Sequence, residues 1–147
     1  MIKGIIFDWV ETLSSGSRSL FPYSERVLKE CKKRGYKLGL ISLAGRGIEE
    51  RWEDFRVTGI LKYFDSVLVG GEKTEEQFLQ CMKEMGTTPE TTAIVDDRSI
   101  RGIAIGNSLG CTTFWIQKGK WAHEALNKET GEPTYRINTI EDLFTYL

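Results

Sequence analysis

Charged or hydroxyl side chains stand directly after four separate apolar runs of this sequence. The positions are Asp8, Ser42, Lys73 and the pair Asp96-Asp97. Carboxylates brought close together repel one another unless a cation lies between them or one of them is protonated. A hard cation such as Mg²⁺, held by one or two carboxylates, a backbone carbonyl and several waters, removes that conflict. If the fold gathers these residues, their types predict a site for a divalent cation and an anion.

Lys73 adds a positive charge beside the predicted start of a helix, where a cation is disfavoured. A lysine there is stabilised if it holds an anion, either a phosphate group or the Asp8 carboxylate. Ser42 and Thr12 could donate hydrogen bonds to the same anion. Each of these residues also has a purely structural interpretation. Asp8 could be a turn carboxylate, Lys73 could point to solvent, and the hydroxyls of Ser42 and Thr12 could belong to ordinary turns.

The apolar pattern and the helix-end signals predict strands that alternate with helices. Strands are expected at residues 2–7, 37–41, 65–71, 91–97, 111–116 and 134–137. Helices are expected at residues 25–34, capped by Ser24, and at 47–57, 74–86, 100–109 and 139–147. This order indicates an α/β fold, a doubly wound parallel sheet in three layers. Because ligands bind outside the carboxyl ends of such strands, the four polar positions are expected to meet at one edge.

Composition and length predict one globular domain spanning residues 1–147. Twenty basic and 21 acidic residues leave almost no net charge, which predicts no general attraction to nucleic acid or to anionic membrane. No apolar run suits a membrane span, and the start of the sequence does not resemble a signal peptide. Three widely spaced cysteines without a CxxC pair indicate reduced thiols, and therefore a cytoplasmic protein. A single histidine argues against a histidine-based metal or triad site.

Four motifs in this sequence resemble, in order, those of the haloacid dehalogenase-like (HAD) hydrolase superfamily. They are "FDWVETL" around Asp8, "LIS" ending at Ser42, "GGEKTEEQF" around Lys73, and "TAIVDDRSIRGIAIGNSLGCTTFWI" around Asp96-Asp97. The similarity covers about residues 2–116. Each motif is weak alone, but four in the right order, each at a predicted strand end, are specific.

The resemblance implies a phosphatase that acts through an aspartyl-phosphate. Asp8 would be the nucleophile. Ser42, Lys73 and Thr12 would bind the phosphoryl group, and Lys73 would also neutralise charge as Asp8 attacks.

The same resemblance implies a Mg²⁺ cofactor. Its ligands would be the carboxylates of Asp8 and Asp97 and the backbone carbonyl of Val10, with Asp96 close by. The cation would shield the nucleophile from the negative charge of the substrate.

Three positions depart from the family pattern. Phosphatases of this superfamily normally carry a second aspartate, the general acid and base, where this chain has Val10. General acid–base catalysis typically contributes about 100- to 10,000-fold, so a slow phosphatase is expected. Glu11 is expected to face away from the site, since neighbours on an extended segment point to opposite sides. Gly102 stands where related sequences often carry an acid. These departures motivate an alternative, a degenerate module that binds a phosphate or phosphoprotein without turnover.

The intervals 13–41 and 43–72 are too short to hold a cap domain, so no cap is expected. Dehalogenases and phosphonatases of the superfamily also lack the second aspartate, but they need a cap, which argues against those activities here. Capless members tend to have open sites, and the phosphorylated substrate could therefore be macromolecular. Trp52, Phe55 and Trp121 could line a partner surface, although Phe55 also fits a core position.

Overall fold

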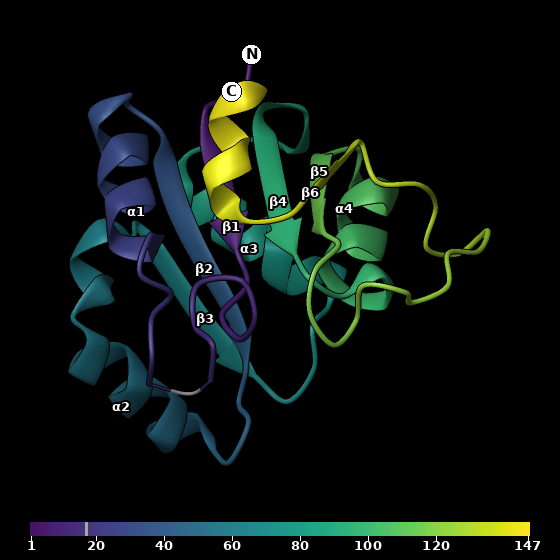
Figure 1. Ribbon diagram of the computed structural model, residues 1–147. Coiled ribbons are helices and arrows are strands. Elements are labelled where there is room, and N and C mark those ends of the chain that lie inside the picture. Colours follow the sequence, from purple (N-terminus) through teal and green to yellow (C-terminus); the bar gives the residue numbers. More distant parts are fainter. Residues whose placement is uncertain (17) are drawn as a thin grey trace.

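Six short strands pair in parallel to form one sheet, with the order β3-β2-β1-β4-β5-β6 (Figure 1). The structure, a computed structural model, describes residues 1–16 and 18–147. The strands are β1 (Gly4–Phe7), β2 (Lys37–Leu43), β3 (Ser66–Gly70), β4 (Thr92–Asp96), β5 (Thr112–Ile116) and β6 (Tyr135–Ile137). This arrangement confirms the predicted α/β fold with a parallel sheet.

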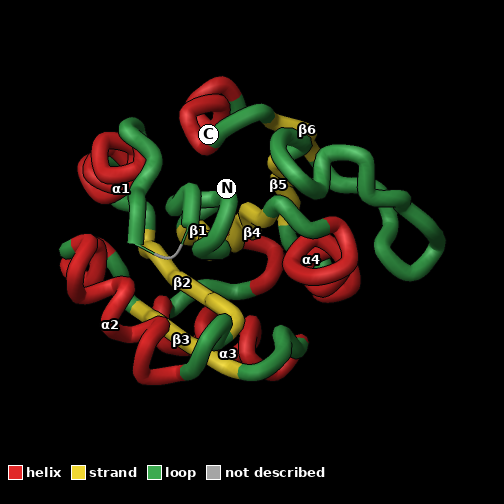
Figure 2. The backbone as a smooth tube through the Cα atoms, turned by 60° about the horizontal axis from the view of Figure 1, so that its bottom comes forward, coloured by secondary structure: helices red, strands yellow, loops and turns green. Residues whose placement is uncertain are grey.

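Helices lie on both faces of the sheet, which gives three layers (Figure 2). The α-helices are α1 (Ser24–Lys33), α2 (Ile48–Thr58), α3 (Glu75–Met85) and α4 (Ala104–Leu109). Short 3₁₀ helices span Ile60–Tyr63, Pro89–Thr91 and Ile140–Thr145, and one π-helical turn spans Ser99–Ile103. Helix α1 and the C-terminal 3₁₀ helix cover one face, and α3 and α4 cover the other (Figure 2).

Alternate residues of each central strand point to opposite faces, so every strand contributes to two cores. Phe7 of β1 packs on one face with Leu28 of α1 and Phe55 of α2. Ile6 packs on the other face with Phe78 of α3. Buried on both faces, the sheet is a rigid platform for the loops at its carboxyl edge.

Local details differ from the sequence prediction at three elements. Ser24 is the first residue of α1 rather than its cap, and its hydroxyl donates to the carbonyl of Leu13 at 2.7 Å. Strand β2 continues past Ser42 to Leu43. The C-terminal helix is 3₁₀ rather than α-helical.

The predicted helix at residues 100–109 is interrupted. Arg101 has non-helical dihedrals (φ −114°, ψ −106°), so a π-helical turn precedes the short helix α4. Helix α3 begins at a capping box, in which the side chain of Thr74 accepts from the N–H of Gln77 and the Gln77 side chain accepts in return from the N–H of Thr74.

No cap domain is inserted among the described residues. The described part of the β1–β2 interval consists of loop and α1, and the β2–β3 interval holds α2 and one 3₁₀ turn. This confirms the prediction of a capless fold. Among the described helices, none is both long enough and apolar enough for a bilayer span.

Candidate active site

Asp8 lies directly beyond the carboxyl end of β1, at the centre of the sheet. Its backbone N–H donates to the carbonyl of Val95 at 3.0 Å, so the ladder with β4 fixes its position. Its carboxylate accepts from Thr12 Oγ1 at 3.3 Å and from Lys73 Nζ at 2.7 Å. The loop that carries Thr12 is a tight turn, in which the N–H groups of residues 12–14 all donate to the carbonyl of Trp9. Thr12 is therefore held against the Asp8 carboxylate.

Lys73 reaches the same place from the turn between β3 and α3. Its Nζ lies 2.7 Å from Asp8 Oδ1 and 2.9 Å from Asp96 Oδ2, and its side chain is only 3% exposed. Burial disfavours the charge on Lys73, but the two adjacent carboxylates outweigh burial and raise its pKa above the ordinary value. The lysine is therefore a permanent cation between the ends of β1 and β4.

Asp96 and Asp97 are adjacent in sequence but have different surroundings. Asp96 accepts hydrogen bonds from the N–H groups of Arg98 and Gly102, both at 3.0 Å, in addition to Lys73. A Cβ atom on Gly102 would lie 2.4 Å from Asp96 Oδ2. Gly102, which departs from the family pattern, has no side chain to clash with Asp96, so its backbone N–H can approach and bind the Asp96 carboxylate. Asp97 instead lines the open pocket together with Asp8.

The three carboxylates form one cluster. Asp8, Asp96 and Asp97 each offer an oxygen, and these atoms all lie within 4.8 Å of one another. Burial, followed by the charges of Asp8 and Asp96, raises the pKa of Asp97 to about 9. Burial and Asp96 also raise the pKa of Asp8. At Asp96 burial acts in the same direction, but the charge and hydrogen bond of Lys73, together with the N–H of Arg98, outweigh it and lower the pKa.

The donor set fits a hard divalent cation. Lys73 balances the charge of one of the three carboxylates, of which Asp96 and Asp97 are buried, and burial together with the remaining negative charge raises the pKa of Asp97. A second cation between Asp8 and Asp97 would meet two carboxylate oxygens at the pocket surface, which is the coordination that Mg²⁺ prefers. Asp96, whose oxygens already accept three donors, orients Lys73 rather than facing the pocket.

Mg²⁺ binding is expected to release a proton from Asp97. Between the ordinary aspartate pKa and about 9, the folded metal-free protein binds more protons than the unfolded chain, so its free energy of unfolding falls as pH rises. With Mg²⁺ bound, the free energy of unfolding should instead rise with pH. The affinity of the protein for Mg²⁺ should rise about tenfold per pH unit from pH 6 to 8. Calorimetric titrations in buffers of different ionisation enthalpy measure the protons released. An affinity that does not change with pH would contradict the assignment.

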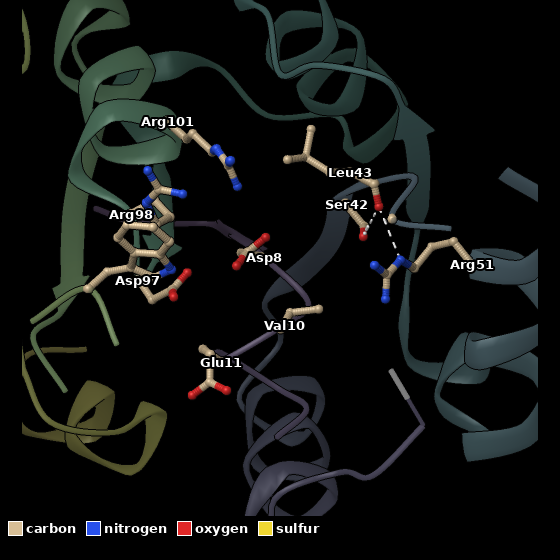
Figure 3. Close-up of a pocket in the computed structure, with 11 residues that line it drawn as sticks. Asp8, Val10, Glu11, Ser42, Leu43, Arg51, Asp97, Arg98 and Arg101 are labelled. Atoms are coloured by element: carbon tan, nitrogen blue, oxygen red, sulfur yellow. Dashed lines mark hydrogen bonds between the residues drawn. The ribbon is translucent and has the colours of Figure 1, made fainter. Parts of the chain in front are cut away.

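A pocket of about 200 Å³ opens in front of Asp8 (Figure 3). Ser42, Leu43, Gly45 and Arg51 form one wall, and Asp97, Arg98, Arg101 and Trp121 form the other, with Asp8, Val10 and Glu11 between them. Ser42 lines the pocket with Asp8, as predicted from the sequence. Its hydroxyl, however, donates to the carbonyl of Leu43 at 2.8 Å rather than to Asp8.

Val10 and Glu11 occupy the part of the wall next to Asp8. Val10 lines the pocket, so no proton donor or acceptor side chain is present where superfamily phosphatases place their second aspartate. Glu11 also contributes to the wall, but its carboxylate points away from Asp8 (Figure 3). Its backbone is in the left-handed region (φ 66°), and this turn carries its side chain away from the nucleophile.

Three arginines of the pocket were not predicted from the sequence, whereas the core position considered for Phe55 is confirmed. Arg98 and Arg101 follow the Asp96-Asp97 motif directly, a signal that could have found them, whereas Arg51 comes from α2. Phe55 is fully buried and Trp52 packs against the same core, so neither forms a free partner surface. Trp121 lines the pocket beneath the guanidinium of Arg98.

Comparison with known proteins agrees with this geometry. A family described as haloacid dehalogenase-like hydrolase matches residues 1–116. A glyceraldehyde 3-phosphate phosphatase from Methanocaldococcus jannaschii is 33% identical over 84% of this chain and 54% of its own length. A phosphoserine phosphatase from Thermus thermophilus is 26% identical over 85% of this chain and 50% of its own. The chain thus spans about half the length of these curated relatives.

A solved structure shares the fold over the full chain. It is an uncharacterized protein from Listeria monocytogenes serotype 4b, which aligns with a TM-score of 0.76 at 17% identity and covers 97% of this chain and 94% of its own. At this identity the likeness concerns the fold alone.

Proposed function

Since the chain belongs to the haloacid dehalogenase-like hydrolase family, we propose that it is a Mg²⁺-dependent phosphatase that acts through an aspartyl-phosphate on Asp8. The observation that carries the proposal is the position of the Asp8 carboxylate. It lies at the end of the central strand, is bonded to Lys73 at 2.7 Å, and faces a pocket across from Asp97. A carboxylate fixed by a permanent cation at an open pocket is suited to nucleophilic attack.

The reaction has two displacements at phosphorus. A carboxylate oxygen of Asp8 forms a bond to phosphorus as the ester P–O bond breaks, and the alkoxide leaves with a proton from solvent. Water then attacks phosphorus, inorganic phosphate is released, and the carboxylate of Asp8 is restored. Lys73 stabilises the negative charge that develops on the phosphoryl oxygens. The Asp8 and Asp97 carboxylates and the backbone carbonyl of Val10 would hold Mg²⁺, which supplies Lewis-acid stabilisation of that charge.

Val10 limits the substrates that can react quickly. Without an acid at this position, the leaving alkoxide must take its proton from water, so esters of acidic alcohols should react fastest. The pocket of about 200 Å³ has room for a small phosphate ester. The named activities of the relatives, on glyceraldehyde 3-phosphate and phosphoserine, also support a small phosphorylated substrate.

Hydrolysis of para-nitrophenyl phosphate tests the proposal, because this ester has an acidic leaving group. We expect steady release of inorganic phosphate with Mg²⁺, loss of that release with a chelator, and its return when Mg²⁺ is added back. Hydrolysis that is indifferent to the metal would argue against the proposed site.

A second candidate is a module that binds phosphate without turnover, and Val10 is the observation that favours it. Binding of a phosphate mimic, with no hydrolysis of para-nitrophenyl phosphate at saturating Mg²⁺, would support this module over the enzyme.

Val10→Asp is expected to raise kcat by about 100-fold for an ester with a poor leaving group such as glycerol phosphate, because it restores a general acid and base. The gain should be smaller for para-nitrophenyl phosphate, whose leaving group needs no proton. Val10→Asn is the matched control, with the same shape and no proton to transfer. Equal rates for the two variants would show that position 10 does not limit the reaction.

A further inference from the structure

The positive charges around the pocket exceed what the phosphoryl site requires. Arg98 is already engaged, because its guanidinium lies 2.8 Å from Glu124 Oε2 and 3.6 Å from the ring centre of Trp121. Glu124 also accepts from the N–H and the hydroxyl of Ser99. Arg98 therefore anchors the β5–β6 loop, and its charge is paired.

On the opposite wall, one carboxylate faces three arginines. Asp54 lies 2.7 Å from Arg18, 3.3 Å from Arg51 and 3.8 Å from Arg46. This cluster carries surplus positive charge. Arg51 is its member at the pocket wall, held in place by a hydrogen bond from Nε to the carbonyl of Leu43 at 3.1 Å.

Arg101 differs from these arginines. Within residues 1–16 and 18–147, its guanidinium makes no ion pair and no side-chain hydrogen bond. It is half-buried, and Figure 3 shows its guanidinium extending into the pocket on the side of Asp8 away from Val10. Arg51 lies on the opposite wall of the same pocket (Figure 3). An unpaired guanidinium inside a pocket is a recognition group for a planar or tetrahedral anion.

We propose that the pocket recognises a second anionic group on the substrate, a carboxylate or a second phosphate, through Arg101, with Arg51 contributing from the other wall. The substrate class is then a small phosphate ester with an additional anion a few carbon atoms from the transferred phosphoryl group. This inference rests on the proposed function in one respect, because it places the phosphoryl group at Asp8. At Asp8 the phosphoryl group would be bound by Lys73 and the metal. Arg101 would then remain available to bind the second anion.

Binding of non-hydrolysable phosphonates tests the inference independently of turnover. The probes are 3-phosphonopropionate, with a carboxylate, and propane-1,3-bisphosphonate, with a second phosphonate. Propylphosphonate has a neutral methyl group at the same place and is the reference. With saturating Mg²⁺, we expect the wild-type protein to bind at least one doubly anionic probe about 10- to 100-fold more tightly than propylphosphonate. The preferred probe identifies the second anion.

Arg101→Gln should remove this preference and change the propylphosphonate Kd by less than about threefold, while Arg101→Lys should retain part of it. Arg56→Gln, on the exposed face of α2, is the control and should retain all of it. Equal binding of the three probes by the wild type would overturn the inference, as would an equal loss for all probes in Arg101→Gln. Because these probes cannot turn over, an inactive enzyme leaves the result interpretable.

Discussion

Asp8→Asn is expected to lower the rate of phosphate ester hydrolysis by about 10⁴-fold or more, the scale on which loss of a nucleophile acts. Asparagine has the shape of aspartate and can still accept from Lys73 Nζ, which lies 2.7 Å from Asp8 Oδ1. It cannot form an acyl phosphate by displacing the ester oxygen. The measurement is kcat for para-nitrophenyl phosphate at saturating Mg²⁺.

The fold should survive this change. Burial and the charge of Asp96 raise the pKa of Asp8 despite the adjacent Lys73, so removal of the Asp8 charge should leave the melting temperature unchanged or higher. Glu76→Gln makes the same carboxylate-to-amide change on the exposed surface of α3 and should leave the rate unaltered. An Asp8→Asn rate within tenfold of wild type would mean that another group attacks phosphorus.

Lys73→Met is expected to lower kcat by about 10³-fold and to destabilise the metal-free protein by about 3–5 kcal/mol. The lysine ammonium is the counter-charge for Asp8 and Asp96, at 2.7 and 2.9 Å. Without it, three carboxylates, two of them buried, lie together with no cation. Denaturant unfolding and para-nitrophenyl phosphate hydrolysis measure the two effects.

The stability loss in Lys73→Met should depend on pH. Lys73 lowers the pKa of Asp96 in the folded protein, so the stabilisation is present above the ordinary aspartate pKa and is lost as pH falls through the lowered value. The difference between wild type and variant should therefore shrink as pH falls below the ordinary aspartate pKa of 3.8. Lys83→Met, on the exposed side of α3, is the control. A variant as stable as wild type at pH 7 would contradict the ion-pair assignment.

The sequence was sufficient to predict the sheet and the convergence of its edge residues. Parallel strands present their carboxyl ends at one edge, so the positions of Asp8, Lys73 and Asp97 follow once the strands are recognised. The motifs could therefore be predicted to lie close together in the fold, because each one follows the end of a strand of the same sheet.

The sequence could not assign separate surroundings to Asp96 and Asp97. Of the two N–H groups that fix Asp96, that of Arg98 directly precedes a π-helical turn and that of Gly102 lies within it, where a regular helix was predicted. Such a turn has no distinct apolar period. The arginine pocket was missed for a related reason: Arg51 and Arg101 lie on different elements, and only tertiary packing places both at one cavity.

The most direct test of the account is to locate the phosphoryl group on the protein. Because Val10 provides no general base to activate water, the aspartyl-phosphate should break down slowly and accumulate during turnover. The measurement is acid quenching during hydrolysis of para-nitrophenyl phosphate with Mg²⁺, followed by peptide mass spectrometry. We expect a phosphorylated peptide whose modified residue is Asp8 in the wild type and no such peptide in Asp8→Asn. Steady turnover with the phosphoryl group on another residue, or with none on the protein at any time, would contradict it.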